Sequence, residues 1–199
     1  MQNIIITGAS HGIGRAIAKK LSKKYHIINI DIVENKMDKV DFYKCDLSDK
    51  SKLLKTIEKI KTNIDSLYAL INNAVLFSSK SLEKQTLEEW ENIISINLTA
   101  PYILSKEFAS MLKQSKGHII NISSTRASMS EAGTEAYSSS KGGISSLTHA
   151  LAITLSPDVK VNSISPGWIN TNEEYLPTKV DNEQHPSGRV GTPDDIVDT

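Results

Sequence analysis

Short apolar runs alternate with segments of helical periodicity along nearly the whole chain, and this alternation constrains the fold most. The predicted strands are Asn3–Thr7, His26–Asp31, Asp41–Lys44, Ser66–Ile71, Gly117–Ile122 and Lys160–Ile164. The predicted helices are Gly12–Lys24, Lys50–Thr62, Leu87–Gln114 and Tyr137–Ser156. Alternation of this kind favours right-handed β-α-β crossovers. We therefore predict an α/β fold in three layers, a doubly wound parallel sheet covered by helices on both faces.

Length and composition exclude several classes of protein. The 199 residues suffice for one domain with a substantial core, and no repeat or linker divides them, so we expect a single domain over 1–199. Lys+Arg and Asp+Glu both total 23, so no net charge favours nucleic acid or an anionic membrane. The apolar runs are too short to span a bilayer, and the N-terminus has no basic segment typical of a secretory signal.

The single cysteine, Cys45, rules out an intrachain disulfide and is compatible with a reducing compartment. We expect Cys45 to be a small core residue in a strand, and the protein to be cytoplasmic, with no metal. Near the other end, Thr192-Pro193-Asp194-Asp195 is a strong helix-start pattern, yet the sequence stops at Thr199. We therefore expect the sequence to be part of a longer chain.

The stretch Thr7-Gly8-Ala9-Ser10-His11-Gly12-Ile13-Gly14 directly follows the apolar run Ile4-Ile5-Ile6. Glycines between a strand and a helix let the backbone approach a ligand, and the unpaired amides at the helix start favour a phosphate. The spacing G-x-x-x-G-x-G differs from the commonest dinucleotide-binding pattern, so an ordinary βα turn remains an alternative. Asp31 ends the next strand, where a carboxylate can accept from both ribose hydroxyls and repel a 2′-phosphate, which favours NAD over NADP.

Tyr137 and Lys141 are four residues apart at the start of a predicted helix, so they share one face. A tyrosine with a pKa near 10 is a poor proton-transfer group at neutral pH. An ammonium about 6 Å away would lower that pKa by about two units. Such a pair also occurs by chance on solvated helix faces, so the spacing alone does not establish a site.

Two further polar residues follow or interrupt apolar segments. Ser123-Ser124 ends a buried strand, where a hydroxyl could donate to a substrate oxygen or only cap a turn. Pro101 lies four residues after Asn97 and cannot donate the helical hydrogen bond to its carbonyl. We expect a kink that frees the Asn97 carbonyl to hold a water, although a bend needed only for packing is the alternative.

Taken in order, these features resemble the short-chain dehydrogenase/reductase family, in the group with the T-G-x-x-x-G-I-G turn. The resemblance covers nearly the whole chain. Its elements are Thr7–Gly14, Asp46-Leu47, Asn72-Asn73-Ala74, Asn97, Ser124, Tyr137-x-x-x-Lys141 and Pro166-Gly167-x-x-x-Thr171. Ser124 matches the family serine better than Ser123 because it stands thirteen positions before Tyr137.

The resemblance implies a Rossmann-like fold and an NAD(H)-dependent oxidoreductase that interconverts a secondary alcohol and a ketone by hydride transfer. It implies cofactor contacts with Gly8, Ser10, Gly12, Ile13, Gly14, Asp31, Asp46, Leu47, Asn73, Ala74, Tyr137, Lys141, Pro166, Gly167, Ile169 and Thr171. In the reductive direction Ser124 would bind the carbonyl oxygen and Tyr137 would supply the proton. Lys141 would orient the nicotinamide ribose, and Asn97 would anchor a water. A homodimer or homotetramer is also implied.

The chain departs from the family pattern at Val75, where Asn-Asn-Ala-Gly would have glycine, so we expect the following loop to run differently. The family also continues through a further helix and strand, which are missing here. The loop Thr125–Glu135 and the segment Trp168–Pro186 should border the substrate. Arg126 could meet an anionic group or be solvated, and Trp168 could pack on the substrate or be structural.

The substrate segment, about residues 168–190, is short and polar (Asn172, Glu173, Glu174, Asp181, Asn182, Glu183), which favours a modest polar alcohol or ketone. Two other functions remain open. One is an NADPH-dependent 3-oxoacyl reductase, which Asp31 disfavours. The other is a protein that binds the cofactor but is catalytically silent and regulatory, which the set Ser124, Tyr137 and Lys141 disfavours.

Overall fold

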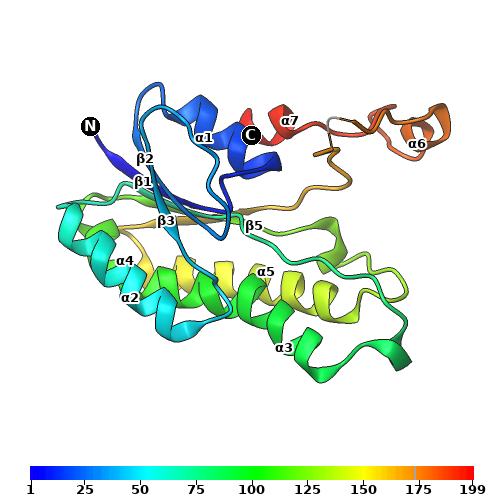
Figure 1. Cartoon of the computed structure of the whole chain (residues 1–199), viewed down its shortest axis with the longest axis horizontal. Coiled ribbons are helices and arrows are strands. Elements are labelled where there is room, and N and C mark those ends of the chain that lie inside the picture. Colours follow the sequence, from blue (N-terminus) through cyan, green and yellow to red (C-terminus); the bar gives the residue numbers. More distant parts are fainter. Residues whose placement is uncertain (173) are drawn as a thin grey trace.

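The computed structural model describes residues 1–172 and 174–199, and its centre is a six-stranded sheet (Figure 1). The strands are β1 (Asn3–Thr7), β2 (His26–Asp31), β3 (Val40–Lys44), β4 (Ala69–Asn72), β5 (His118–Ile122) and β6 (Lys160–Ile164). They are ordered β3-β2-β1-β4-β5-β6, and every neighbouring pair is parallel. The predicted doubly wound, Rossmann-like sheet is confirmed.

Helices cover both faces of this sheet. They are α1 (Gly12–Leu21), α2 (Lys50–Asn63), α3 (Leu87–Ile94), α4 (Ala100–Gln114), α5 (Glu135–Leu155), α6 (Lys179–Glu183) and α7 (Pro193–Val197). Short 3-10 turns, η1 (Leu82–Lys84) and η3 (Thr125–Ala127), and a π-helical turn, η2 (Ser95–Thr99), complete the chain. Figure 1 shows α1 and α7 on one face and α2, α4 and α5 on the other. Within the described residues, no helix has the length and apolar content needed to cross a membrane.

The core follows from the two-residue period of β1. Successive side chains of a strand point to opposite faces, so Ile4 and Ile6 join one apolar cluster and Ile5 joins another. The first cluster includes Ile17 of α1, and the second includes Phe108 of α4. Each of these five side chains is buried, which is worth about 1.5–3 kcal/mol for a side chain of this size. The sheet is therefore held between two layers, and its carboxyl edge is left open for polar residues.

Most predicted boundaries agree with the structure, and the exceptions have local causes. β4 begins at Ala69 rather than at Ser66, because the Ser66 carbonyl accepts a hydrogen bond from the Asn3 side chain instead of from a strand. α1 ends at Leu21, whose carbonyl accepts from Tyr25 in a closing turn. The prediction that Cys45 lies in a strand is wrong by one residue, since β3 ends just before it, but Cys45 is buried as predicted.

The predicted helix Leu87–Gln114 is divided by the π-helical turn η2. The Ala100 N–H donates to the Ser95 carbonyl, five residues earlier, where an α-helix would use the fourth. Pro101 has no N–H that could donate to the Asn97 carbonyl, so the regular α-helical hydrogen bond cannot form here. The break predicted near Pro101 is thus present, in the form of a wide turn that contains Asn97.

Candidate active site

The glycine-rich turn between β1 and α1 is packed too tightly for larger residues. Gly8 and Gly12 have φ values of +69° and +52°, a region that residues with a Cβ rarely adopt. A Cβ on Gly14 would lie 2.2 Å from the Gly8 carbonyl oxygen. Glycine is therefore required at Gly8 and Gly12 for conformation and at Gly14 for space.

Thr7 and Asn73 hold this turn against the end of β4. The Thr7 hydroxyl oxygen accepts from the backbone N–H groups of Asn73 and Ala74, both at 3.0 Å. The Asn73 amide nitrogen donates to the carbonyls of Thr7 and Gly8, also at 3.0 Å. The Asn73 side chain is thus used to fix the glycine turn, at the point where β1 and β4 lie side by side.

The N-terminus of α1 differs from those of α2 and α3. Asp49 and Thr86 cap α2 and α3 with side-chain hydrogen bonds, whereas among the described residues none caps α1 at His11. The first amides of a helix lack intrahelical partners, and the helix dipole makes this end positive. Gly12 and Ile13 line a pocket, so the free amides lie beside a space that an anion could occupy.

This pocket has a volume of about 570 Å³ and lies along the carboxyl edge of the sheet. Its wall includes Asp31, Asp46 and Leu47, with Gly8, His11, Gly12, Ile13, Ile30, Ile32, Cys45, Ser48, Asn73, Ala74, Val75, Leu76, Asn92, Ile96 and Thr171. The Asp31 carboxylate accepts backbone N–H groups from Ser10 at 3.0 Å and from Ile32 at 2.7 Å, so its position is fixed. The uncapped amides, the fixed carboxylate and the volume fit a dinucleotide.

Several residues predicted to contact the cofactor are not on the wall of this pocket. Ser10 is fully buried, and its hydroxyl donates to the Val33 carbonyl and accepts from Asn29, so it holds the turn from behind. Gly14 is not on the pocket wall either. Four residues between β6 and α6 were also predicted as cofactor contacts. Thr171 lies on the pocket wall next to Gly12. The other three, Pro166, Gly167 and Ile169, are not among the residues that line the pocket.

Tyr137 and Lys141 lie on one face of α5, as their spacing predicts. The Lys141 ammonium is 5.7 Å from the centre of the Tyr137 ring. It also donates to the Ile122 carbonyl at 2.7 Å, at the end of β5. Ser124 lies two residues beyond that strand, and its hydroxyl is close enough to the Tyr137 phenol to lower the pKa of that group. The hydroxyls of Ser124 and Tyr137 are therefore neighbours, and a buried cation lies beside them.

The predicted lowering of the Tyr137 pKa is wrong for the protein without a cofactor. Burial has the largest influence and raises the pKa of Tyr137, while the Ser124 hydroxyl and the positive charge of Arg126 act in the opposite direction. Burial also lowers the pKa of Lys141 to about 8, because its ammonium is removed from water. Burial therefore dominates the acidity of both groups.

Asn97 connects the π-helical turn to α5 and to the loop after β4. Its side-chain oxygen accepts from the Leu76 N–H at 2.8 Å, and its nitrogen donates to the Leu76 carbonyl at 2.9 Å and to the Ser140 hydroxyl at 3.0 Å. Ser140 in turn donates to the Tyr137 carbonyl at 2.7 Å. Asn97 thus fixes the position of α5 relative to the loop that carries Leu76, which lines the pocket.

The same loop brings a residue to the site that sequence reasoning missed. Phe77 packs edge-on against Tyr137, with ring centres 5.0 Å apart and planes at 82°. Val75 avoids positive φ, which is consistent with the expected change in the loop where the family has glycine. The departure from the family pattern at Val75 indicated that this loop would differ, but it did not predict that Phe77 would contact Tyr137. Nothing in the sequence predicted the contact between Ser140 and Asn97.

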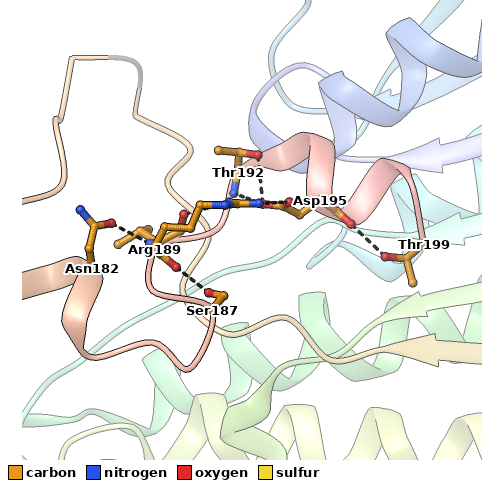
Figure 2. Close-up of polar contacts among 7 residues, drawn as sticks. Asn182, Ser187, Arg189, Thr192, Asp195 and Thr199 are labelled. Atoms are coloured by element: carbon orange, nitrogen blue, oxygen red, sulfur yellow. Dashed lines mark hydrogen bonds and ion pairs between the residues drawn. The ribbon is translucent and has the colours of Figure 1, made fainter.

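The segment between β6 and α7 is held by contacts near both of its ends. Trp168 packs on Tyr175 and His185, with ring centres 6.0 and 5.9 Å apart, which favours the structural interpretation of this residue. Figure 2 shows the second attachment, where the Arg189 guanidinium contacts the Asp195 carboxylate of α7. Asp195 also accepts from Thr192, and α7 packs on α1. Of the polar residues predicted here, Glu173 lies outside the described residues.

Known proteins share both the sequence and the fold. The family model described as "short chain dehydrogenase" matches residues 2–175. An uncharacterised oxidoreductase of Thermotoga maritima is 43% identical over 97% of this chain and 84% of that protein. The 3-oxoacyl-[acyl-carrier-protein] reductase FabG of Aquifex aeolicus is 31% identical over 97% of this chain and 86% of its own length.

Solved structures agree with these relatives. An apo SCOR enzyme from Clostridium thermocellum superimposes with a TM-score of 0.91 at 40% identity, covering 99% of this chain and 83% of that one. A 4-hydroxyisoleucine dehydrogenase complexed with NADH gives a TM-score of 0.90 at 32% identity, covering 100% of this chain and 88% of that one. The chain thus shares its fold with solved oxidoreductases.

Proposed function

The chain belongs to the short-chain dehydrogenase family of oxidoreductases, and we propose that it interconverts a secondary alcohol and a ketone with NAD(H) as its preferred cofactor. One observation carries the proposal. Ser124 and Tyr137 form a hydroxyl pair beside the buried Lys141, and Asn97 connects their helix to Leu76 on the wall of a pocket that also includes the uncapped N-terminus of α1 and the Asp31 carboxylate.

The pocket residues would hold the cofactor along its length. The amides at the start of α1 would bind the pyrophosphate, and Asp31 would accept from the adenosine ribose. Asp46 and Leu47 would border the adenine, and Thr171 would close over the turn near Gly12. When bound, the nicotinamide of the cofactor supplies or accepts the hydride.

The protein residues would handle the proton and the orientation of the substrate. Ser124 would donate to the substrate carbonyl oxygen, and Tyr137 would give its proton to that oxygen as the alcohol forms. Because burial raises the pKa of Tyr137, the phenol holds its proton at neutral pH and can act as the donor. Lys141 would turn toward the nicotinamide ribose, and the Asn97 carbonyl would hold a water behind it.

A second enzymatic candidate is an NADPH-dependent 3-oxoacyl reductase, which the name of the Aquifex aeolicus relative favours. Asp31 argues against it, because a carboxylate on the pocket wall at the end of β2 would repel a 2′-phosphate. A catalytically silent cofactor-binding protein is the remaining candidate. A silent protein would have no need of Ser124, Tyr137 and Lys141 together.

We propose that residues 1–199 act as one domain, with the segment of about residues 168–190 bordering the substrate. We also propose a cytoplasmic homodimer or homotetramer built partly on α4 and α5. Cys45 as the free, buried cysteine supports a reducing compartment. Analytical ultracentrifugation of the purified chain tests the assembly.

Purified protein should be assayed on sugars, hydroxy acids, cyclic ketones and 3-oxoacyl thioesters, each with NAD(H) and with NADP(H). The proposal expects turnover of a secondary alcohol or ketone, with a higher kcat/KM for NAD(H). Preference for NADPH with a 3-oxoacyl thioester would establish the second candidate. Tight binding of NADH without turnover of any of these compounds would favour the silent protein.

A further inference from the structure

Arg126 is fixed beside the proposed catalytic hydroxyls. It lies in the turn η3, which begins three residues after the end of β5, and its backbone N–H donates to the Ser124 hydroxyl oxygen at 3.1 Å. The Arg126 side chain is 31% exposed, so it can reach solvent from a partly buried position. Its positive charge also acts on Tyr137, whose pKa it lowers against the effect of burial. Arg126 is therefore a cation at the substrate end of the site.

The guanidinium of Arg126 already binds a carboxylate in this structure. One terminal nitrogen donates to the Met129 carbonyl at 3.0 Å, and the other contacts the carboxylate of Glu131. These contacts use two of the five N–H donors of the side chain. The Glu131 side chain is 61% exposed, and ion pairs this accessible contribute little. A second carboxylate can therefore compete for the same guanidinium at small cost.

Phe77 supplies an apolar surface beside Tyr137. Its side chain is 58% exposed although its ring packs edge-on against the tyrosine. The two hydrogen bonds between the Asn97 side chain and the Leu76 backbone hold the adjacent residue, so the Phe77 ring extends from a fixed loop. A substrate at Tyr137 would thus meet an apolar ring and a guanidinium.

We propose that the substrate is a hydroxy acid or oxo acid whose carboxylate binds Arg126 in place of Glu131 while its carbon chain packs on Phe77. This inference rests on the proposed oxidoreductase function and names its substrate class. Arginine suits this role because its planar fork can bind both oxygens of a carboxylate. Glu131 would occupy the guanidinium when the substrate is absent.

Matched substrate pairs give the test. Each 2-, 3- and 4-hydroxy acid is assayed with NAD beside its primary amide, which has the same shape but no charge. Arg126→Gln should lower kcat/KM for the acid by about 10- to 100-fold and change it for the amide by less than about 3-fold. Glu131→Gln should raise kcat/KM for the acid by about 2- to 5-fold, because it removes the competing carboxylate.

Lys113→Gln is the matched control, since it removes an exposed cation at the last turn of α4, near the opposite edge of the sheet. It should leave both substrates unchanged. An equal loss for acid and amide in Arg126→Gln would overturn the proposal, because a merely structural arginine would act on both. A fall for the acid in Glu131→Gln would also overturn it.

A binding measurement separates this proposal from the proposed function. Isothermal titration of the NADH-loaded protein with butanoate and butanamide needs no turnover. Wild type should bind butanoate at least about 10-fold more tightly than Arg126→Gln does, and butanamide equally in both. Equal butanoate affinity in the two proteins contradicts the carboxylate site, whatever the outcome of the activity assays.

Discussion

The ammonium of Lys141 donates a 2.7 Å hydrogen bond to the carbonyl of Ile122, at the last residue of β5. This contact places a buried cation beside Tyr137 before any cofactor is present. A neutral carbonyl stabilises an ammonium less than a carboxylate would, so burial dominates and lowers the pKa of Lys141 to about 8. The fold therefore places at the site a lysine whose charged form is destabilised by burial.

The lowered pKa of Lys141 predicts how stability depends on pH. Its folded value, about 8, lies below its ordinary value of 10.5, so the unfolded chain binds more protons between these two pH values. The free energy of unfolding should therefore rise from pH 8 to pH 10.5, by up to about 3 kcal/mol from this residue. Urea denaturation of wild type and Lys141→Met measures the difference.

Both proteins keep Tyr137, whose raised pKa acts in the opposite direction at high pH, so the comparison isolates Lys141. The Lys141→Met curve should lie above that of wild type below pH 8 and approach it as the pH rises. A constant difference between the two curves would show that the lysine titrates alike in the folded and unfolded chains.

Asp31 should control the choice between the two nicotinamide cofactors. Asp31→Asn keeps the shape of the side chain but removes the charge that repels a 2′-phosphate and accepts from the ribose. We expect the preference for NADH over NADPH to fall by about 1–3 kcal/mol. Fluorescence titration with both cofactors measures it, with the exposed Asp65→Asn as the charge-matched control. An unchanged preference would exclude Asp31 as the selecting residue.

Gly14 and Gly167 both match the family pattern, but only Gly14 lies where the surrounding atoms leave no space for a Cβ. A Cβ at Gly14 would lie 2.2 Å from the Gly8 carbonyl oxygen, whereas at Gly167 no described heavy atom outside its immediate neighbours lies within 4 Å. Gly14→Ala should lose about 1–3 kcal/mol of stability and weaken NADH binding. Gly167→Ala should stay within about 0.5 kcal/mol of wild type. Thermal unfolding and NADH titration test both, and equal effects would refute the packing account.

The fold was largely predictable because strand and helix periods are local properties of the chain. The runs Asn3–Thr7 and His26–Asp31 coincide with observed strands, since both are rich in β-branched isoleucine, and Lys160–Ile164 coincides as well. The division of the helix at Asn97 followed from one missing donor at Pro101. The form of that break, a π-helical turn, was not predicted, nor were the contacts of Asn97 with Leu76 and Ser140, which are distant in sequence.

The candidate site was predictable as a set of positions but less so as a set of contacts. The i, i+4 spacing placed Tyr137 and Lys141 together, because helix geometry alone decides it. The direction of the Tyr137 pKa was not predictable, since it depends on burial. The contacts of the Ser10 hydroxyl with Val33 and Asn29 were not predictable either, because these residues are distant in sequence.

The most direct test of the account compares wild type with Tyr137→Phe, on whichever secondary alcohol the panel shows to be turned over. The variant loses only the phenol oxygen and keeps the ring that packs on Phe77. We predict that kcat falls by about 100- to 10,000-fold while NADH affinity and thermal stability stay near those of wild type. Turnover at the wild-type rate would contradict the assignment of Tyr137 as the proton donor, and with it the proposed mechanism.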